Sequence, residues 1–193
     1  IIDNGSIEED TINFLDEFKG GDCFANIQKV LHIPGEFNYS DLNNKASEIA
    51  EGDVFLLLNN DIKILSPDWG LKICSNSLRP KVGFVGAKLL FEDDTIQHAG
   101  VVLGIGGVAG HSHKYFELES GGYFNKLNLS QQYSALTGAF LGISRNNWEI
   151  IGGLDDIFLK VNYNDVDVCL KAYKKGLKNL YLPDLIIYHY ESK

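Results

Sequence analysis

The residues Gly52–Asp61 constrain the fold more than any other segment of the chain. The five apolar residues Val54–Leu58 show neither a helical nor a two-residue period, which predicts a strand buried on both faces of a parallel sheet. The apolar run stops abruptly at two asparagines and Asp61. Ligands of open α/β sheets bind beyond the carboxyl ends of the strands, so Asp61 lies where a binding site is expected. A polar turn explains the same residues, and the segment alone leaves both interpretations open.

The segments around this strand predict alternating strands and helices. A capping box of Ser6 and Glu9 predicts a helix that ends at Gly20-Gly21. Ser40 is expected to cap a second helix, and Ser66-Pro67 to open a third. Strands are expected at 27–33, 54–58, 82–85, 133–144 and 185–188. This alternation predicts an α/β fold with a mostly parallel sheet and right-handed crossovers.

The pattern changes after residue 80. Lys88–Phe91 and Ile96–Leu103 flank a polar turn, which predicts an inserted antiparallel hairpin. The glycine-rich segment 104–123 is expected to be a mobile cover over a binding site. Asn164 is predicted to cap a last helix. The apolar stripe of that helix is expected to consist of Val166, Cys169, Leu170 and Tyr173.

Composition excludes several classes of protein. A length of 193 residues with 45% hydrophobic content fits one globular domain. The net charge of −9 argues against a nucleic-acid partner. The three cysteines form no C-x-x-C motif, which favours a reducing compartment over a disulfide framework. No stretch approaches the ~18 apolar residues of a membrane span. The chain begins with isoleucine and lacks methionine, so we expect it to be a fragment of a longer protein.

The titratable candidates each have an ordinary structural explanation. Asp165 and Asp167 lie in the first turn of the predicted last helix, where the helix dipole favours negative charge without any catalytic role. His111 and His113 form an H-x-H pair that could bind a metal, but such a pair in a surface loop more often binds nothing. The remaining unassigned histidines, His32 and His98, are interpreted as structural. The formal dinucleotide fingerprint at 104–109 is rejected because no βαβ context surrounds it.

Five elements in order resemble the family 2 glycosyltransferases, the inverting enzymes with the GT-A fold. The elements are Asp3-Asn4-Gly5-Ser6, the segment 37–61 ending in N-x-D, Thr137-Gly138-Ala139 with Gly152-Gly153-Leu154-Asp155, Asn164-Asp165, and Tyr188-His189-Tyr190-Glu191-Ser192. The segments Gln97-His98-Ala99-Gly100 and Gly110-His111 are similar to the branch that builds bacterial O-antigen, rhamnan and other surface polysaccharides. The resemblance implies one α/β domain at 1–193, a three-layer GT-A fold with a mostly parallel sheet and an inserted antiparallel hairpin. It also implies that the first strand is missing before Ile1.

The resemblance implies transfer of a hexosyl or deoxyhexosyl group, with inversion, from a nucleotide-diphosphate sugar to a saccharide or lipid-linked saccharide. A UDP- or dTDP-linked donor is expected, with Mn²⁺ or Mg²⁺ as the cofactor. Asp165 would be the general base, and Asp61 with His189 would bind the metal. The implied donor-binding residues are Asp3, Asn44, Asn59, Asn60 and Asp61. The implied acceptor-binding residues are Thr137, Gly138 and Asn164.

Two departures from the family pattern keep alternatives open. Asn164 stands where the family usually has glutamate, and the strand that lines the nucleotide pocket is not in the sequence. A non-catalytic GT-A-like interaction or regulatory module is therefore one alternative. A nucleotidyltransferase, which also places a metal-binding aspartate after a buried strand, is the other. The parent protein is expected in the cytoplasm, with peripheral association at the inner face of the cell membrane.

Overall fold

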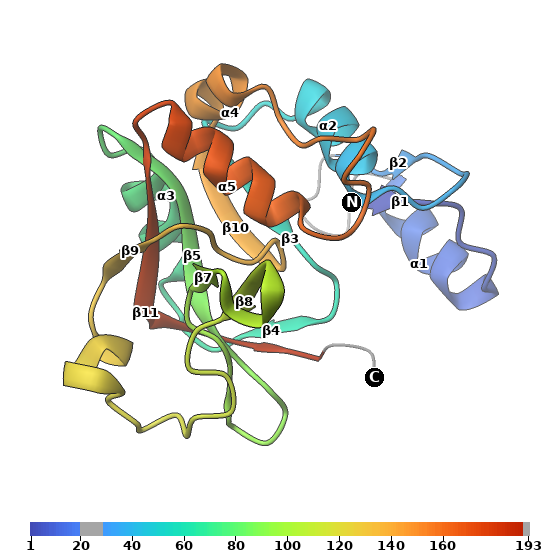
Figure 1. The fold of residues 1–193 in the computed structure, drawn as a ribbon. Coiled ribbons are helices and arrows are strands. Elements are labelled where there is room, and N and C mark those ends of the chain that lie inside the picture. The colour runs from blue at the N-terminus through green and yellow to red at the C-terminus, as the bar shows by residue number, and fades with distance from the viewer. Residues whose placement is uncertain (20–28, 191–193) are drawn as a thin grey trace.

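The chain folds into three layers, with a mixed sheet between helices (Figure 1). The computed structural model describes residues 1–19 and 29–190. Helices α4 (Arg145–Ile151) and α5 (Asn164–Lys174) cover one face of the sheet, and α3 (Trp69–Ser77) covers the other. Each face has its own cluster of buried apolar side chains, which explains why both helix layers are held against the sheet. The predicted α/β class and layer arrangement are confirmed.

The central sheet has the strand order β3 (Val54–Leu58), β10 (Phe140–Ser144), β5 (Val82–Leu90), β11 (Lys178–His189), β4 (Ile62–Ile64). Strands β3, β5 and β11 run in one direction, and β10 runs antiparallel between β3 and β5. All nine residues of β5 are buried, as expected at the centre of the sheet. Strand β3 lies instead at an edge, and its last residue, Leu58, is 47% exposed. The prediction that β3 is buried on both faces is therefore wrong.

Two short strands extend this sheet. Strand β6 (Ile96–His98) pairs antiparallel with β5 and completes the predicted hairpin. Strand β9 (Gln131–Tyr133) pairs with β11. The single strand predicted at 133–144 is thus two strands, β9 and β10, which belong to different parts of the sheet because the turn around Gly138 separates them. The strand predicted at 185–188 is only the end of β11, which begins at Lys178 and continues past a register shift after Leu182.

The N-terminal residues form a small separate sheet. Strands β1 (Ile2–Asp3) and β2 (Leu31–His32) pair in parallel, and helices α1 (Glu9–Lys19) and α2 (Tyr39–Ile49) follow them in the chain. Figure 1 shows this unit to the right of the central sheet, next to α2. The predicted strand at 27–33 is described only from residue 29 onward, and the predicted helix stop at residues 20–21 lies outside the described residues.

Three serines predicted as helix starts have other partners. The Ser6 hydroxyl donates to Asp3 Oδ1 at 2.7 Å, and α1 begins only at Glu9. The cap of α2 is Asn38, whose side chain accepts the Asp41 N–H, whereas the buried Ser40 hydroxyl donates to a loop carbonyl. Ser66 accepts an N–H from β11, and α3 starts three residues later. Ser6 is thus held by a competing local turn, whereas Ser40 and Ser66 bind partners distant in the sequence.

Helix α5 also begins differently from the prediction. Asn164 is its first residue rather than its cap, and it follows Tyr163, which has a left-handed backbone with φ of 59°. Side chains of Val166 and Cys169 are buried as predicted. Tyr173, placed on the predicted stripe, is 68% exposed, and Val168 and Ala172 are buried instead. The buried face is rotated because α5 packs against both β5 and β11.

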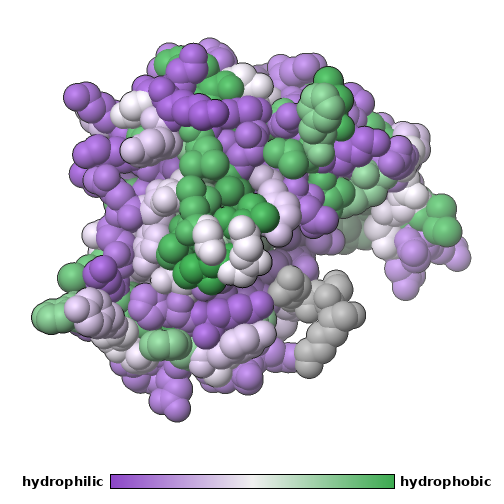
Figure 2. All heavy atoms as spheres, viewed as in Figure 1, coloured by the Kyte–Doolittle hydropathy of each residue, from purple (hydrophilic) through white to green (hydrophobic). Residues whose placement is uncertain are grey.

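The glycine-rich segment after β6 is a second hairpin. Strands β7 (Val101–Leu103) and β8 (Ala109–His111) pair antiparallel around the short helix η1 (Ile105–Gly107), and helix η2 (Tyr123–Asn128) follows. Apolar side chains gather at the hairpin in the middle of the face shown in Figure 2. Leu103, Ile105 and Val108 are 42–57% exposed there. The mobility expected of residues 104–123 stays a prediction. No helix among the described residues is long and apolar enough to cross a membrane.

Candidate active site

The predicted metal residues Asp61 and His189 meet at the edge of the sheet. His189 Nε2 lies 3.2 Å from Asp61 Oδ1. The cause is the path of the chain after β3: residues 62–64 form β4, which pairs antiparallel with the end of β11, so that His189 lies opposite Ile62. The Tyr190 N–H donates to the Asp61 carbonyl at 2.8 Å and fastens the two segments together. The predicted proximity is confirmed, although a returning strand, rather than neighbouring parallel strands, produces it.

The His189 ring is oriented by a glutamine. Its Nδ1–H donates to Gln97 Oε1 at 2.7 Å, since a carbonyl oxygen can only accept. The other ring nitrogen, Nε2, therefore carries a lone pair in the neutral ring, and it faces both Asp61 and the Asn59 amide nitrogen at 3.4 Å. Asp61 Oδ1 is buried and has no hydrogen-bond partner among the described residues. Two electron-rich atoms that converge in this way fit a divalent cation.

The donor set suits a cation that also binds substrate. Within residues 1–19 and 29–190, no three or more Cys, His, Asp or Glu side chains are grouped to hold a metal. Asp61 and His189 would therefore supply two ligands and leave the rest to another molecule. Mg²⁺ and similar cations in proteins commonly bind one or two carboxylates together with substrate phosphate oxygens. Imidazole as the second ligand favours Mn²⁺ over Mg²⁺.

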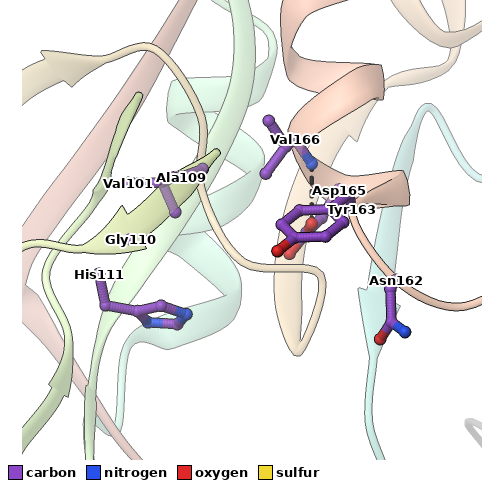
Figure 3. A pocket seen from close by; sticks show the side chains of 8 residues that line it. All are labelled: Val101, Ala109, Gly110, His111, Asn162, Tyr163, Asp165 and Val166. Carbon is purple, nitrogen blue, oxygen red and sulfur yellow. Dashed lines mark hydrogen bonds between the residues drawn. The ribbon is translucent and has the colours of Figure 1, made fainter. Parts of the chain in front are cut away.

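Asp165 lies in the wall of a pocket at the start of α5 (Figure 3). The cavity has a volume of about 400 Å³, within the range usual for ligand sites. Its lining consists of Val101, Ala109, Gly110, His111, Asn162, Tyr163, Asp165 and Val166. The hairpin β7–β8 thus forms one wall, and the first turn of α5 with the residues before it forms the other. Polar groups of His111 on one wall and of Asn162, Tyr163 and Asp165 on the other converge on the cavity, and such convergent polar groups orient small ligands in binding sites.

Two backbone amides hold the Asp165 carboxylate. Oδ2 accepts the Gly138 N–H at 3.0 Å, and Oδ1 accepts the Val166 N–H at 2.7 Å. The Gly138 carbonyl in turn accepts the Tyr39 hydroxyl at 2.9 Å. Burial and, to a lesser extent, the Asp165 charge raise the pKa of Tyr39, so this hydroxyl remains a donor. Asp165 is therefore fixed in position while it lines the pocket.

The turn at 137–139 connects Asp165 with Asp61 and His189. Gly138 binds Asp165, as described above, and the next residue, Ala139, accepts the Asn59 N–H at 3.0 Å through its carbonyl. Asn59 in turn approaches His189. The residues predicted as base and as metal ligands are thus parts of one hydrogen-bonded assembly.

Tyr163 has a strained backbone at the pocket edge. Its φ of 59° is in the left-handed region, which a tyrosine adopts rarely and at a cost of about 1–3 kcal/mol. Tyr163 and Asp165 both line the pocket, as Figure 3 shows. The ring is 49% exposed and thus accessible from the pocket. Strain of this kind is concentrated at functional sites.

The polar groups of several predicted binding residues already form hydrogen bonds within the protein. Asn44 uses both polar atoms of its amide on the backbone of Leu154, at 2.9 and 3.0 Å, so its contacts support a structural role instead of the predicted nucleotide contact. The Gly138 N–H donates to Asp165 and its carbonyl accepts from Tyr39, and its predicted role in acceptor binding stays a prediction. Thr137 Oγ1 accepts the Ala139 N–H at 3.5 Å, within the same turn.

The Asp3 carboxylate has little hydrogen-bonding capacity left for the base of a nucleotide. Its Oδ1 accepts the Ser6 hydroxyl and the Ser6 N–H, and its Oδ2 lies 2.5 Å from His32 Nδ1. The Ser6 hydrogen bonds, followed by that of His32, lower the pKa of Asp3 to about 2. The predicted contact with the nucleotide base would have to replace one of these partners.

Asn60, another predicted donor-binding residue, is exposed and directly precedes Asp61.

Asn164 differs from the other predicted acceptor residues. Its side chain is 4% exposed, and its Nδ2 has no hydrogen-bond partner among the described residues. It does not line the pocket that contains Asp165. Its predicted role in acceptor binding stays a prediction.

Sequence reasoning missed three residues of the site. His111 lines the pocket, and His98 contacts His111. Gln97 orients His189. His98 was assigned no function because it belongs to no motif, and His111 because an H-x-H pair in a surface loop more often binds nothing. The only available signal was their position in the Gln97-His98-Ala99-Gly100 and Gly110-His111 segments that carry the family resemblance.

Comparisons with known proteins bear on the fold and the family of the chain. No protein-family model matches the chain. It is 43% identical over 192 residues to the uncharacterized protein y4gI of Sinorhizobium fredii (strain NBRC 101917 / NGR234), covering 100% of the chain and 21% of that protein. It is 36% identical over 159 residues to the O-antigen biosynthesis protein RfbC of Myxococcus xanthus, covering 81% of the chain and 12% of that protein. The chain thus spans about a fifth or less of these relatives.

Two solved structures share the fold over the whole chain. GalNAc-T7 in complex with UDP, GalNAc and Mn²⁺ superposes with a TM-score of 0.77 at 15% identity, and the match covers 37% of that chain. The mannosyltransferase PcManGT from Pyrobaculum calidifontis, in complex with GDP-Man and Mn²⁺, gives a TM-score of 0.66 at 14% identity and a coverage of 47%. The chain therefore has the GT-A glycosyltransferase fold and is similar over most of its length to a protein of O-antigen biosynthesis, which confirms the resemblance inferred from its motifs.

Proposed function

We propose that this chain is the catalytic domain of an inverting glycosyltransferase. It moves a hexosyl or deoxyhexosyl group from a UDP- or dTDP-linked donor to a saccharide or lipid-linked saccharide during synthesis of a surface polysaccharide. The observation that carries the proposal is the single assembly of Asp165, the turn at Gly138 and the Asp61–His189 pair. The GT-A fold and the O-antigen relative support it.

Asp165 is suited to act as the general base. Inversion by a single displacement requires a group that takes the proton of the acceptor hydroxyl as the new bond forms. Asp165 lines a pocket large enough for a sugar ring, and the two amides restrict its carboxylate to one orientation. Because a carboxylate has four lone-pair directions, two amide bonds leave capacity for the acceptor hydroxyl.

The other half of the reaction is charge neutralisation on the departing diphosphate. Asp61 and His189 would hold Mn²⁺, which supplies positive charge to the phosphate oxygens of the leaving group. Both neighbouring solved structures contain Mn²⁺ with a nucleotide or nucleotide sugar, which supports this cofactor. Gln97 keeps the imidazole of His189 turned toward Asp61, and Asn59 lies next to both.

Release of the nucleoside diphosphate tests the proposal. The purified protein is incubated with UDP-, dTDP- and GDP-sugars, Mn²⁺ and a panel of methyl glycosides, and the free nucleotide is measured. Nucleoside diphosphate released in the presence of a glycoside supports transfer. In a parallel assay with UTP, dTTP or GTP and sugar 1-phosphates, release of pyrophosphate would instead indicate a nucleotidyltransferase. Absence of both release and donor binding would indicate a non-catalytic module and refute the proposal.

The cellular location forms a separate part of the proposal. We expect the parent protein in the cytoplasm, bound peripherally at the inner face of the membrane where lipid-linked acceptors are available. Cell fractionation with a high-salt wash tests this expectation. Recovery of the protein only from the periplasmic or extracellular fraction would contradict it.

A further inference from the structure

The histidine that faces Asp165 across the pocket, His111, is exposed and pairs with a buried histidine, His98. His111 stands on β8 opposite Val101, and its ring projects into the pocket from the hairpin wall (Figure 3). Its Nδ1 lies 3.2 Å from Nδ1 of His98. His98 is on β6 and is fully buried, with an exposure of 0%. The two rings meet edge to face, with centroids 5.0 Å apart.

The hydrogen bonds of His98 fix which of its nitrogens carries the proton. The Gly100 N–H donates to His98 Nε2 at 3.2 Å, and an amide N–H cannot accept. His98 Nε2 therefore has the lone pair. Burial, followed by the nearby His111 and His189, holds the pKa of His98 well below its usual value, so the ring is neutral. Its one proton is then on Nδ1, the atom that faces His111.

The same reasoning continues to His111. The Nδ1–H of His98 donates to Nδ1 of His111, which must accept and therefore carries a lone pair. A neutral His111 then has its proton on Nε2. This N–H is the donor that the hairpin presents to the pocket, while Asp165 presents an acceptor from the opposite wall.

The lining of the pocket indicates which substrate meets this donor. It contains Asp165, the proposed base, but none of the residues proposed for the metal and the diphosphate. A group that Asp165 deprotonates must occupy this cavity. The apolar side chains of Val101 and Ala109 in the hairpin wall and the exposed Tyr163 ring offer surfaces for the C–H face of a sugar. The cavity therefore suits the acceptor rather than the nucleotide.

We propose that His111, held as its Nε2–H tautomer by the buried His98, donates a hydrogen bond to an oxygen of the acceptor saccharide and so fixes the sugar against Asp165. The inference rests on the proposed transferase function for the identity of the ligand. His111 is then an acceptor-binding residue, and His98 is a positioning residue that acts through it.

The tautomer is tested without any activity. In the protein labelled with ¹⁵N-histidine, long-range ¹H–¹⁵N correlation spectra distinguish the protonated from the unprotonated ring nitrogen. We expect the Nε2–H form for His111 and the Nδ1–H form for His98, and mixed tautomers of His111 in the His98→Phe variant. An Nδ1–H form of His111 in the wild-type protein would overturn the inference, whatever the protein catalyses.

The role of His111 is tested by acceptor binding and kinetics with methyl glycosides of rhamnose, mannose, galactose and glucose. His111→Phe removes the donor, and His111→Gln restores an N–H near the same place. Loss of one hydrogen bond predicts an acceptor KM or Kd about three- to tenfold higher for His111→Phe, with the donor KM unchanged. His111→Gln should recover most of the affinity. The matched control His113→Phe, two residues along and outside the pocket lining, should stay within about twofold of wild type.

The outcomes separate the two proposals. A wild-type protein that transfers no sugar but binds glycosides through His111 contradicts the proposed function and supports the inference. Transfer with equal acceptor KM in the wild type and His111→Phe contradicts the inference and leaves the function intact. Equal losses in His111→Phe and His111→Gln, or a change confined to the donor KM, would also overturn it.

Discussion

Asp165→Asn should nearly abolish the reaction, whereas Asp167→Asn should leave it almost unchanged. Both acids lie in the first turn of α5, so a role confined to the helix dipole would treat them alike. The structure separates them. Asp165 lines the pocket and binds two backbone amides, whereas Asp167 forms an ion pair with Lys171 at 3.0 Å on the same helix.

The magnitudes follow from these contacts. An asparagine at 165 has one carbonyl oxygen, so it can accept from Gly138 or from Val166 but not from both, and its NH₂ group then faces a second donor. Loss of one hydrogen bond to a charged group costs about 1.5–3 kcal/mol, which corresponds to a fall of roughly 3–12 °C in Tm for a domain of this size. The partly exposed pair of Asp167 with Lys171 is worth only about 0.3–0.5 kcal/mol, or about 1–2 °C.

The effect on catalysis is expected to be much larger than the effect on stability. Loss of a general base lowers kcat by about 10²–10⁴, so Asp165→Asn should be nearly inactive at a temperature where it is still folded. Asp167→Asn should retain activity within about twofold. The assay measures nucleoside diphosphate release at 25 °C with each variant, alongside thermal unfolding by circular dichroism and donor binding by calorimetry.

The result that would refute this reasoning is an equal loss of activity in the two variants. Position along the helix would then not matter, and neither acid could be assigned as the base. An active Asp165→Asn variant would refute it equally. Unfolding of Asp165→Asn at 25 °C would contradict the estimate of its stability, and Asp165→Glu would then test the base, since it keeps a carboxylate in the pocket.

Three further predictions concern the metal, a glycine and acid stability. Asp61→Asn should abolish the Mn²⁺-dependent part of UDP binding measured by calorimetry, and an unchanged Mn²⁺ dependence would exclude Asp61 as a ligand. Gly100→Ala should cost more than about 2 kcal/mol in urea unfolding, because its φ is 100° and a Cβ would lie 2.4 Å from a tyrosine ring, whereas Gly104→Ala, at φ 84° with open space around it, should cost only about 1 kcal/mol. The pKa of Asp3, lowered to about 2 chiefly by Ser6, gives stability that is complete above the ordinary value of 3.8 and is lost as the pH falls through 2. The unfolding free energies of the wild type and Asp3→Asn should therefore differ at pH 6 and converge near pH 2, and a constant difference would contradict the shifted pKa.

The positions of residues that follow apolar strands were predicted correctly, whereas the first residues of the helices were not. Asp61 and His189 were predicted at one sheet edge because both follow apolar runs, and the structure brings them together. The predicted helix starts at Ser6, Ser40 and Ser66 were wrong because Ser6 bonds Asp3 in a local turn, and Ser40 and Ser66 bind partners more than 100 residues away in the sequence. A local capping pattern cannot report such competition.

The polar contacts that complete the site depend on tertiary structure. The hydrogen bond between Gly138 and Asp165 joins residues 27 positions apart, and the one between Gln97 and His189 joins residues 92 positions apart. Neither pair shows a periodic pattern or a fixed spacing from which it could be inferred. His111 was set aside for the same reason: a histidine in a glycine-rich loop acquires meaning only when the hairpin places it across from Asp165.

Strand β6 is only three residues long, yet two of its side chains serve different halves of the site. Gln97 binds the metal-side His189, and His98 binds the pocket-side His111. Successive side chains of a strand point to opposite faces, so these two tasks depend on how β6 pairs with β5, where the register shifts between the Leu90–Ile96 and Leu89–His98 pairs. A slip by a single residue would turn Gln97 toward the pocket and His98 toward Asp61, and both His189 and His111 would lose their partners together. The turn between β5 and β6 is therefore a place where one inserted residue could disable the proposed metal site and the proposed acceptor site at once, although it contacts neither.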